Sequence, residues 1–450
     1  MNFDPAGTDM STNRVKVEVN SLKEGMFVAD LDRPWHETPF PLQGFYIRVD
    51  DDVKALSGYC KSVYVDILKQ KSKPVFEKHA RFNPDESVVR KNPSNDHQVI
   101  DLPPIIIKSP QTYCVQASIK KEVSRATKLH RHVYDAIDHI FSSIADGGDV
   151  SAKETESVAS GMVESVLRNP DALVWLAKMN DEDSHSYQHS VKASIWALVF
   201  GRHLGLKKSM LKTLAMGVLL SHIGKAKIDY ELLESSSTLS GDELDCYQQY
   251  VQHSVALVSS MKNMDAGVSS IVEYHKERHN GTGFPKGVTG DKIPMLAKIA
   301  GLVDYYQELI SPRNNSLGMS PLDAVSELYQ LRNIAFQKDL VERFIEAVGV
   351  YPTGTLVELS SQEVGIVTGH NLDRRLQPKI MVVLDEHKQP LKSGKVIDLK
   401  IRNRLKLQSR PLFIKESLPK GAYDIDENQY LLSGATSRWS WKHISGALAS

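Results

Sequence analysis

The sequence predicts a mainly α protein, in which a helical bundle lies between a small β-rich domain and a short β extension. This fold class follows from the spacing of the apolar residues, which alternate near the N-terminus, follow a helical period over 111–347, and alternate again beyond Val348. The length of 450 residues allows about three domains. Hydrophobic residues make up 41% of the chain and charged residues 24%, which is typical of a globular protein and excludes disorder throughout.

The first β structure is expected near the N-terminus. Residues 1–13 are polar and predict a flexible N-terminus, whereas 14–68 predict a small β-rich domain. Its first strand is indicated by Val15, Val17 and Val19, which alternate with polar residues so that one face can be buried. Turn-forming glycine and proline residues separate the remaining elements. These are strands near 26–28, 44–49 and 63–65 and a short helix near 50–60.

The middle of the chain changes to a helical pattern. Residues 69–110 are rich in lysine, proline, asparagine and serine, which predicts a linker or an extended wrapping segment. Within 111–347, Ser240 is followed three residues later by Glu243, a capping box that predicts the start of a helix. The predicted helices are 115–145, 151–168, 170–178, 186–205, 208–222, 240–261, 264–276, 293–310 and 320–347.

A second β segment is expected at the C-terminal side of the bundle. Residues 348–410 contain short apolar runs between turn residues, which predict a β extension. Basic residues alternate with other residues from Lys400 to Lys406, a pattern that favours a strand with one charged face over a nucleic-acid patch. For residues 411–450 we expect an irregular tail.

Charge and cysteine content exclude several classes of protein. Lysine and arginine number 55, as do aspartate and glutamate, so no overall charge draws the chain to nucleic acid or to an anionic membrane, and we expect neither partner. Three scattered cysteines argue against a disulfide framework or a zinc knuckle and suit a reducing compartment. Because neither a signal sequence nor a transmembrane segment is visible, we expect a cytoplasmic protein.

Histidine is the residue type that points to chemistry. Of the 16 histidines, seven lie between residues 185 and 279, each on a predicted helix or at a helix end. Neutral imidazole is the commonest metal ligand, and helical bundles build metal sites from several helices. The alternative is a chance clustering of surface and core histidines. Asp304 favours the metal, because a carboxylate in an apolar helical run needs a partner unless it lies on the solvent side of the helix.

Two loop segments are distinctive. In 275–285, a helix end runs into Gly281 and Gly283, which allow the backbone to approach a ligand closely. In 219–225, an apolar helix ends in a polar pair that includes His222, and a glycine follows. The alternative for each segment is an ordinary helix end with a tight turn.

Taken together, these segments resemble the HD-GYP family, bacterial hydrolases of cyclic di-GMP within the HD superfamily. The resemblance covers roughly 15–400 and implies an HD-superfamily helical bundle at 111–347. The N-terminal segment resembles the small domain of unknown function that often precedes this catalytic domain, and the strands after the bundle resemble the usual C-terminal extension. The matching positions, in chain order, are His189-Ser190, Leu219 to Lys225, His253, His275 to Pro285, Asp304 and Ser311 to Arg313.

The resemblance implies metal-assisted phosphodiester hydrolysis, but several positions depart from the family pattern. Active members carry His-Asp before Ile-Gly-Lys and two consecutive histidines before Glu-Arg. An imidazole ligates one metal but cannot bridge two, and an ammonium has no lone pair and repels a cation. We therefore expect the multinuclear metal site to be lost. The departures are His185 for a carboxylate, Ser221-His222 for His-Asp, His275-Lys276 for His-His, Asn280 for Asp and Phe284 for Tyr.

The expected function is that of a degenerate HD-GYP protein in cyclic di-GMP signalling, which binds nucleotide or partner proteins with little or no hydrolysis. Lys225 matches a position thought to contact phosphate in the family, and Lys276 and Arg313 are further candidates for nucleotide binding. The remnant site holds either no metal or one divalent iron, manganese or zinc ion. Its candidate ligands are His189, His222, His253, His275 and Asp304.

The resemblance also implies a surface for protein partners. Family members are thought to contact diguanylate cyclases of the GGDEF type through the loop that corresponds to Asn280, Gly281, Gly283, Phe284 and Pro285. Two alternative functions stay open. One is a residual metal-dependent cyclic di-GMP phosphodiesterase, and the other is an interaction protein that ignores the nucleotide.

Overall fold

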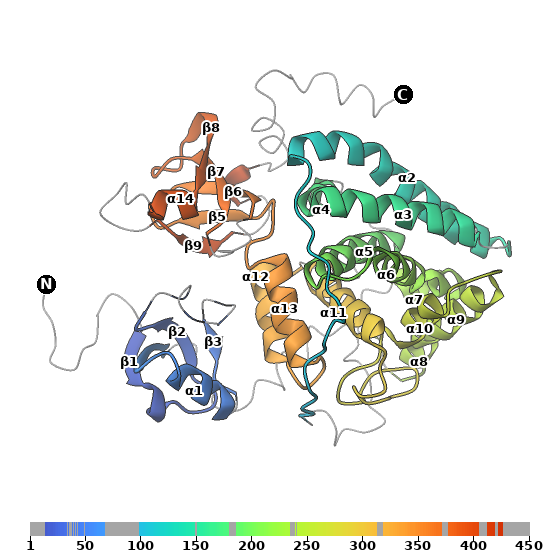
Figure 1. Ribbon diagram of the computed structural model, residues 1–450, viewed down its shortest axis with the longest axis horizontal. Coiled ribbons are helices and arrows are strands. Elements are labelled where there is room, and N and C mark those ends of the chain that lie inside the picture. Colours follow the sequence, from blue (N-terminus) through green and yellow to red (C-terminus); the bar gives the residue numbers. More distant parts are fainter. Residues whose placement is uncertain are drawn as a thin grey trace, which may run out of the picture.

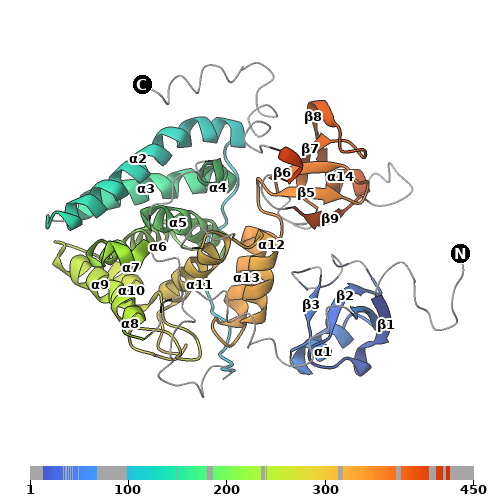
Figure 2. The ribbon, with the colours of Figure 1, turned by 180° about the vertical axis from the view of Figure 1, so that it is seen from behind.

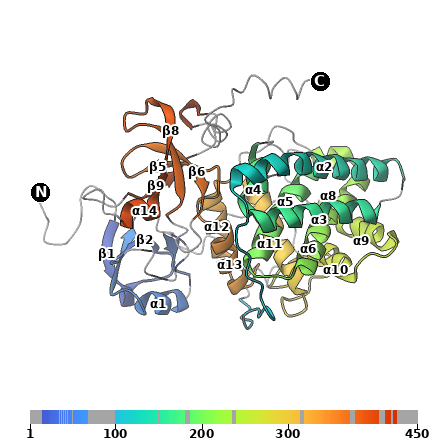
Figure 3. The same ribbon diagram turned by 45° about the horizontal axis from the view of Figure 1, so that its top comes forward.

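The computed structural model of the protein confirms the predicted fold class, with a helical bundle and two small β units (Figure 1). Both β units lie on the side of the bundle formed by helices α12 (Pro321–Gln330) and α13 (Lys338–Val348), as the views from behind and from above also show (Figures 2 and 3). The described residues are 14–67 apart from 34, 36, 37, 39, 41, 43 and 49, then 99–148, 151–179, 186–234, 239, 241–312, 318–370, 377–404, 412–418 and 422–425.

The N-terminal unit is an antiparallel sheet covered by one helix. The strand order is β1-β4-β2-β3, so that the first and last strands in sequence are neighbours. Val19 and Val65 are buried, as the alternating pattern predicts. The elements are β1 (Arg14–Glu18), η1 (Val19–Ser21), β2 (Phe27–Leu31), β3 (Phe45–Tyr46), α1 (Asp50–Ser57) and β4 (Ser62–Asp66).

The helices of the bundle largely follow the predicted segments. The first predicted helix begins later than expected, because Ser118 accepts the N–H of Lys121 and caps α2. The bundle contains α2 (Ile119–Ala145), α3 (Ala152–Arg168), α4 (Pro170–Met179), α5 (Ser186–His203), α6 (Lys208–Leu220), η6 (Ile223–Lys227), α7 (Tyr230–Glu234), α8 (Asp242–Gln248), α9 (Tyr250–Ser260), α10 (Ala266–Tyr274) and α11 (Met295–Ile310), followed by α12 and α13.

Two predicted helices are each divided in the structure. The helix predicted at 240–261 is interrupted at Gln249, which separates α8 from α9. Its N-cap is Gly241, whereas the predicted capping residue Ser240 lies outside the described residues. The helix predicted at 320–347 is divided by the turn at 331–337 into α12 and α13.

The C-terminal unit is a five-stranded antiparallel sheet with the order β8-β7-β6-β5-β9. The predicted strand around Lys400 is wrong, because this segment forms a helix. Asp398 accepts the N–H groups of Lys400 and Ile401 and so provides the helix start that competes with a strand. The elements are β5 (Leu356–Leu359), β6 (Val364–Gly369), β7 (Lys379–Leu384), β8 (Pro390–Asp398), α14 (Leu399–Arg404), β9 (Ile414–Ser417) and η8 (Ala422–Asp424).

An extended segment joins the N-terminal unit to the bundle. Residues 99–113, which we call the strap, contain no helix or strand and run along the bundle (Figure 1). The strap is bound to the turn at 331–337, where the N–H of Ile100 donates to Asn333 O at 2.9 Å and Gln337 Nε2 donates to Pro103 O at 2.9 Å. Across the part of the chain that the structure describes, no helix combines the length and hydropathy needed to span a bilayer.

Candidate functional site

The predicted site residues come from several helices and meet inside the bundle. His189 lies in the first turn of α5, His222 follows the end of α6, His275 follows α10, and Asp304 lies on α11. Helix α11 can approach the end of α10 because Gly301 has no side chain. A Cβ at that position would collide with the backbone carbonyl of His275.

A carboxylate and two imidazoles converge at the centre of the site. Asp304 Oδ1 lies 2.7 Å from His189 Nε2 and 3.3 Å from His222 Nε2. The other ring nitrogen of His222, Nδ1, lies 3.2 Å from Ser190 Oγ. The three residues each offer a ligand atom within 4.8 Å of the others, so together they could hold one metal ion. The structure therefore brings together three of the predicted ligands.

Lys276 is bound by two carboxylates of the same chain. Its Nζ lies 2.8 Å from Asp304 Oδ2 and also contacts Glu308 Oε1. The side chains of Lys276 and Asp304 are 2% and 3% exposed. Glu308 lies four residues beyond Asp304 on α11, so both carboxylates are on the same face of that helix. The ammonium is thus engaged inside the protein.

The protonation states follow from burial and from this ammonium. Burial lowers the pKa of His275 to about 4, although the negative charge of Asp304 acts in the opposite direction. Burial also lowers the pKa of His189, and it holds the pKa of His222 well below its usual value. Burial alone would raise the pKa of the Asp304 carboxyl, but Lys276 and the two nearby histidines hold it well below its usual range. At neutral pH the site therefore contains neutral imidazoles and an ionised Asp304.

Tyr250, rather than His253, is the α9 side chain that reaches the centre. The Tyr250 hydroxyl lies 3.3 Å from His275 Nε2, and its ring centroid lies 5.4 Å from that of His222. Since His275 Nδ1 donates to Val272 O at 2.8 Å, its Nε2 accepts from the Tyr250 hydroxyl. Burial raises the pKa of Tyr250 well above its usual value, which keeps this hydroxyl protonated. His253 is half-buried and is not among the clustered metal-capable side chains of the described residues.

Lys225 lies beside the site on η6. Its Nζ is 5.1 Å from the ring centroid of Tyr250 and 5.6 Å from that of Tyr247. Among the described residues, no carboxylate forms an ion pair with this half-buried ammonium. The helix is held against α9 because Ser254 Oγ accepts the N–H of Gly224 at 2.8 Å. Lys225 therefore combines a fixed position with a positive charge that no carboxylate of the described residues neutralises.

The predicted partner loop is anchored by a buried carboxylate. Glu277, which is not among the predicted site residues, accepts the N–H groups of Lys286 at 2.7 Å and Val288 at 3.0 Å. Gly283 packs against the backbone of 276–278 so closely that a Cβ would collide with it. Gly281 has a φ of +79°, which favours glycine. Both predicted glycines are thus required by the shape of the loop.

The remaining loop residues keep local roles. Asn280 Oδ1 accepts the N–H and the hydroxyl of Thr282, at 3.2 and 2.7 Å, so the amide performs the turn-forming role of a carboxylate. The Phe284 ring packs edge-on against Tyr250, with ring centroids 6.5 Å apart. The peptide bond between Phe284 and Pro285 is cis. His185 and Arg313, which the sequence analysis also singled out, lie outside the described residues.

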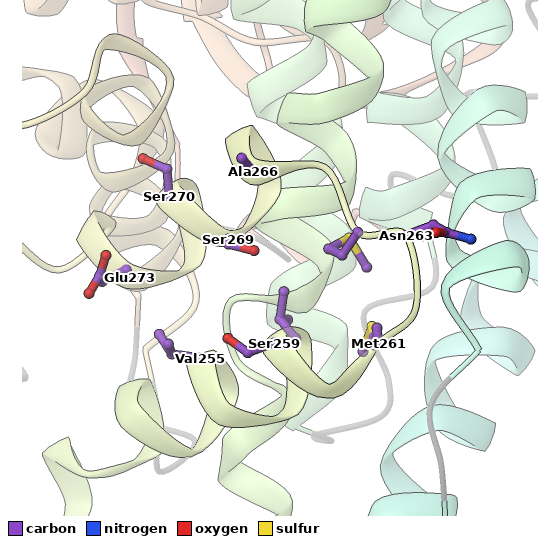
Figure 4. A pocket seen from close by; sticks show the side chains of 10 residues that line it. Val255, Ser259, Met261, Asn263, Ala266, Ser269, Ser270 and Glu273 are labelled. Atoms are coloured by element: carbon purple, nitrogen blue, oxygen red, sulfur yellow. The ribbon is translucent and has the colours of Figure 1, made fainter.

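A separate cavity of about 670 Å³ opens between α9 and α10 (Figure 4). None of the predicted site residues lines it, so it is distinct from the histidine cluster. Apolar side chains and three serines surround it, with Glu273 at one side. The lining residues are Val255, Val258, Ser259, Met261, Asn263, Met264, Ala266, Ser269, Ser270 and Glu273.

The residues do not fit a centre in which a carboxylate bridges two metals. At the position of the bridging carboxylate, His222 presents its two ring nitrogens to different residues, Ser190 and Asp304. Ser221 Oγ donates to Val218 O at 2.8 Å. The second oxygen of Asp304 is bound to the Lys276 ammonium. Among the described residues, the three clustered ligands could hold one metal ion.

Two family models match the chain. Residues 176–336 match the HD domain, and residues 14–155 match the domain of unknown function DUF3391. The HD match falls within the predicted 111–347. The DUF3391 match extends beyond the predicted 14–68, so the boundary between the N-terminal unit and the bundle stays a prediction.

Characterised relatives are similar along much of the chain. The cyclic di-GMP phosphodiesterase PA4108 of Pseudomonas aeruginosa is 25% identical over 386 residues, which cover 85% of this chain and 88% of the relative. The cyclic di-GMP phosphodiesterase PdeB of Borreliella burgdorferi is 26% identical, over 54% of this chain and 62% of the relative.

A solved structure is also similar. Bd1817, described as an HDG"Y"P protein from Bdellovibrio bacteriovorus, is 16% identical, with a TM-score of 0.43 over 74% of this chain and 98% of that chain. The family matches, together with the histidine and aspartate residues that meet between the helices, agree with the motifs in the sequence. The chain contains an HD domain at 176–336 and a DUF3391 domain at 14–155, the two domains that the resemblance to the HD-GYP family implies.

Proposed function

We propose that this protein binds cyclic di-GMP as a signalling protein and hydrolyses it little or not at all. The similarity to cyclic di-GMP phosphodiesterases supports the choice of nucleotide. The observation that carries the proposed loss of hydrolysis is the ion pair between Lys276 and Asp304, at 2.8 Å. A multinuclear centre would need that carboxylate oxygen for a metal ion.

Nucleotide binding requires a cation that can meet a phosphate. Lys225 meets this requirement, because its ammonium is held over two tyrosine rings and is not paired with a carboxylate of the described residues. In contrast, Lys276 is buried between two carboxylates. We therefore assign phosphate contact to Lys225, while Arg313 stays a second candidate.

Calorimetry with cyclic di-GMP tests this assignment. We expect the native protein to release heat on binding and Lys225→Met to bind about tenfold or more weakly, because a charged hydrogen bond to phosphate is lost. Lys227→Met is the matched control, since Lys227 is exposed on the same short helix. Absence of heat with native protein at high concentration would contradict nucleotide binding and favour a protein that acts through partner proteins such as GGDEF-type cyclases.

The second candidate function is a residual phosphodiesterase with one metal ion. It is favoured by the convergence of His189, His222 and Asp304, which offer two nitrogens and one oxygen. Metal analysis after purification with and without oxygen separates the two candidates. A stoichiometry near one iron, manganese or zinc ion per chain would support the residual enzyme, whereas far less than one would support the metal-free protein.

A further inference from the structure

Two carboxylates and one lysine form a buried group in the bundle. The side chains of Asp304, Glu308 and Lys276 are 3%, 13% and 2% exposed. Both carboxylates project from α11, one helical turn apart, toward the same ammonium. A buried charge is strongly destabilising unless an opposite charge accompanies it. Each member of this group therefore depends on the others.

The other side chains near this group approach it differently from Lys276. His189 and His222 lie against Asp304 Oδ1, at 2.7 and 3.3 Å, whereas Asp304 Oδ2 faces the Lys276 ammonium at 2.8 Å. Lys225 lies over the tyrosine rings and forms no ion pair with either carboxylate of this group. Among the described residues, Lys276 is therefore the cation that pairs with both carboxylates of α11, and a metal ion is the alternative counter-charge.

We propose that the Lys276 ammonium is the resident cation of this site, which stands in for a metal ion as the counter-charge of Asp304 and Glu308. The bundle then keeps its native packing without metal. This inference deepens the proposed function, because it concerns the same site and explains how the site could lose its metal without losing the fold. It also gives Glu308 a role, as the second anchor of the ammonium.

The inference makes a prediction about the chain without this charge. In Lys276→Met, the carboxylates of Asp304 and Glu308 would remain buried beside an uncharged side chain of similar length. A divalent cation could then replace the ammonium, with oxygen ligands from Asp304 and Glu308 and nitrogen ligands from the neighbouring histidines. Metal dependence should therefore appear when the lysine is removed.

Thermal unfolding of the full chain tests this directly. We expect the melting temperature of the native protein to be the same with EDTA and with Mn²⁺. We expect Lys276→Met in EDTA to melt about 5 °C or more below the native protein, since breaking a buried ion pair is strongly destabilising. Mn²⁺ should recover part of that loss, with metal bound to the variant in mass spectrometry of the intact protein.

Lys298→Met is the matched control, because Lys298 lies on α11, as Asp304 and Glu308 do, but donates to the neutral amide of Gln337 at 2.7 Å. It should gain no response to Mn²⁺. If Lys276→Met does not fold, the native protein alone still tests the inference. A lower melting temperature of the native protein in EDTA than in Mn²⁺ would overturn it. A Lys276→Met protein that melts like the native one without metal would also overturn it.

Two measurements on the native protein in EDTA, its melting temperature and its binding of cyclic di-GMP, distinguish this inference from the proposed function. Cyclic di-GMP binding is measured on the native protein in EDTA. Absence of binding together with an EDTA-insensitive melting temperature would contradict nucleotide binding and support the resident cation. Binding together with an EDTA-sensitive melting temperature would overturn the resident cation and support nucleotide binding.

Discussion

The N-terminal unit is bound to the bundle by a buried ion pair, which gives a prediction that can be worked out in detail. Arg332 Nη2 lies 3.2 Å from Asp52 Oδ1, and the two side chains are 8% and 9% exposed. Asp52 Oδ2 also accepts the N–H of Arg48 at 3.0 Å. The guanidinium of Arg332 lies 3.3 Å from the ring centroid of Tyr329, whose ring contacts Phe45 of β3.

The substitution Asp52→Asn removes the negative charge without changing the shape of the side chain. Breaking a buried pair from one side costs about 3–5 kcal/mol. Arg332 keeps Glu342 as a second partner at 3.3 Å, so we expect the lower end of that range. A loss of about 3 kcal/mol corresponds to a rise of more than a hundredfold in the population with the N-terminal unit undocked.

Native-state hydrogen exchange measures this population. We expect faster exchange of the amides of α12 and of the strap in Asp52→Asn, and no change in Glu18→Gln, which alters an exposed residue of the same unit. Equal exchange rates in native protein and Asp52→Asn would refute the reasoning, because the ion pair would then contribute nothing to docking.

Three further predictions concern the bundle. Gly224→Ala should destabilise it by several kcal/mol in chemical denaturation, because a Cβ would collide with the backbone of α9. Burial lowers the pKa of His130 from 6.5 to about 4, so below pH 6.5 the unfolded chain binds a proton that the folded chain does not. Stability should fall by up to about 3 kcal/mol as the pH falls from 6.5 to about 4, and His130→Gln should remove this part of the decline. The combined variant Ser221→His, His222→Asp and Lys276→His should raise cyclic di-GMP hydrolysis with Mn²⁺ above that of the native protein, if only ligands were lost, and linear product by chromatography checks this.

The sequence was sufficient for the order of the β-rich, helical and β segments and for the burial of Asp304. The helical period places Asp304 in an apolar run, and the structure confirms that its carboxylate is buried with partners. A positive φ in the loop was also predictable and is found at Gly281, whereas Gly283 packs closely against the chain's own backbone at 276–278 and not against a ligand. These features depend on local chain geometry.

Other features depend on contacts that no local pattern reveals. Tyr250 reaches the site from the start of α9, after the interruption at Gln249, where the sequence suggested one continuous helix. Glu308 could have been suspected from its spacing of four residues after Asp304, but its partner Lys276 comes from another element. Helix α14 forms although the residues from Lys400 to Lys406 alternate as in a strand. It forms because the carboxylate of Asp398 accepts two backbone N–H groups at the start of the helix.

The central claim is that this HD-GYP protein binds cyclic di-GMP without cleaving it. Anaerobic incubation of the purified chain with cyclic di-GMP and either Mn²⁺ or Fe²⁺, with both bound nucleotide and linear product measured, tests the claim most directly. The account predicts bound nucleotide and no linear product above that formed without protein. Turnover of the nucleotide would contradict it, because the remaining histidines and Asp304 would then assemble a hydrolytic metal site despite the Lys276 ammonium.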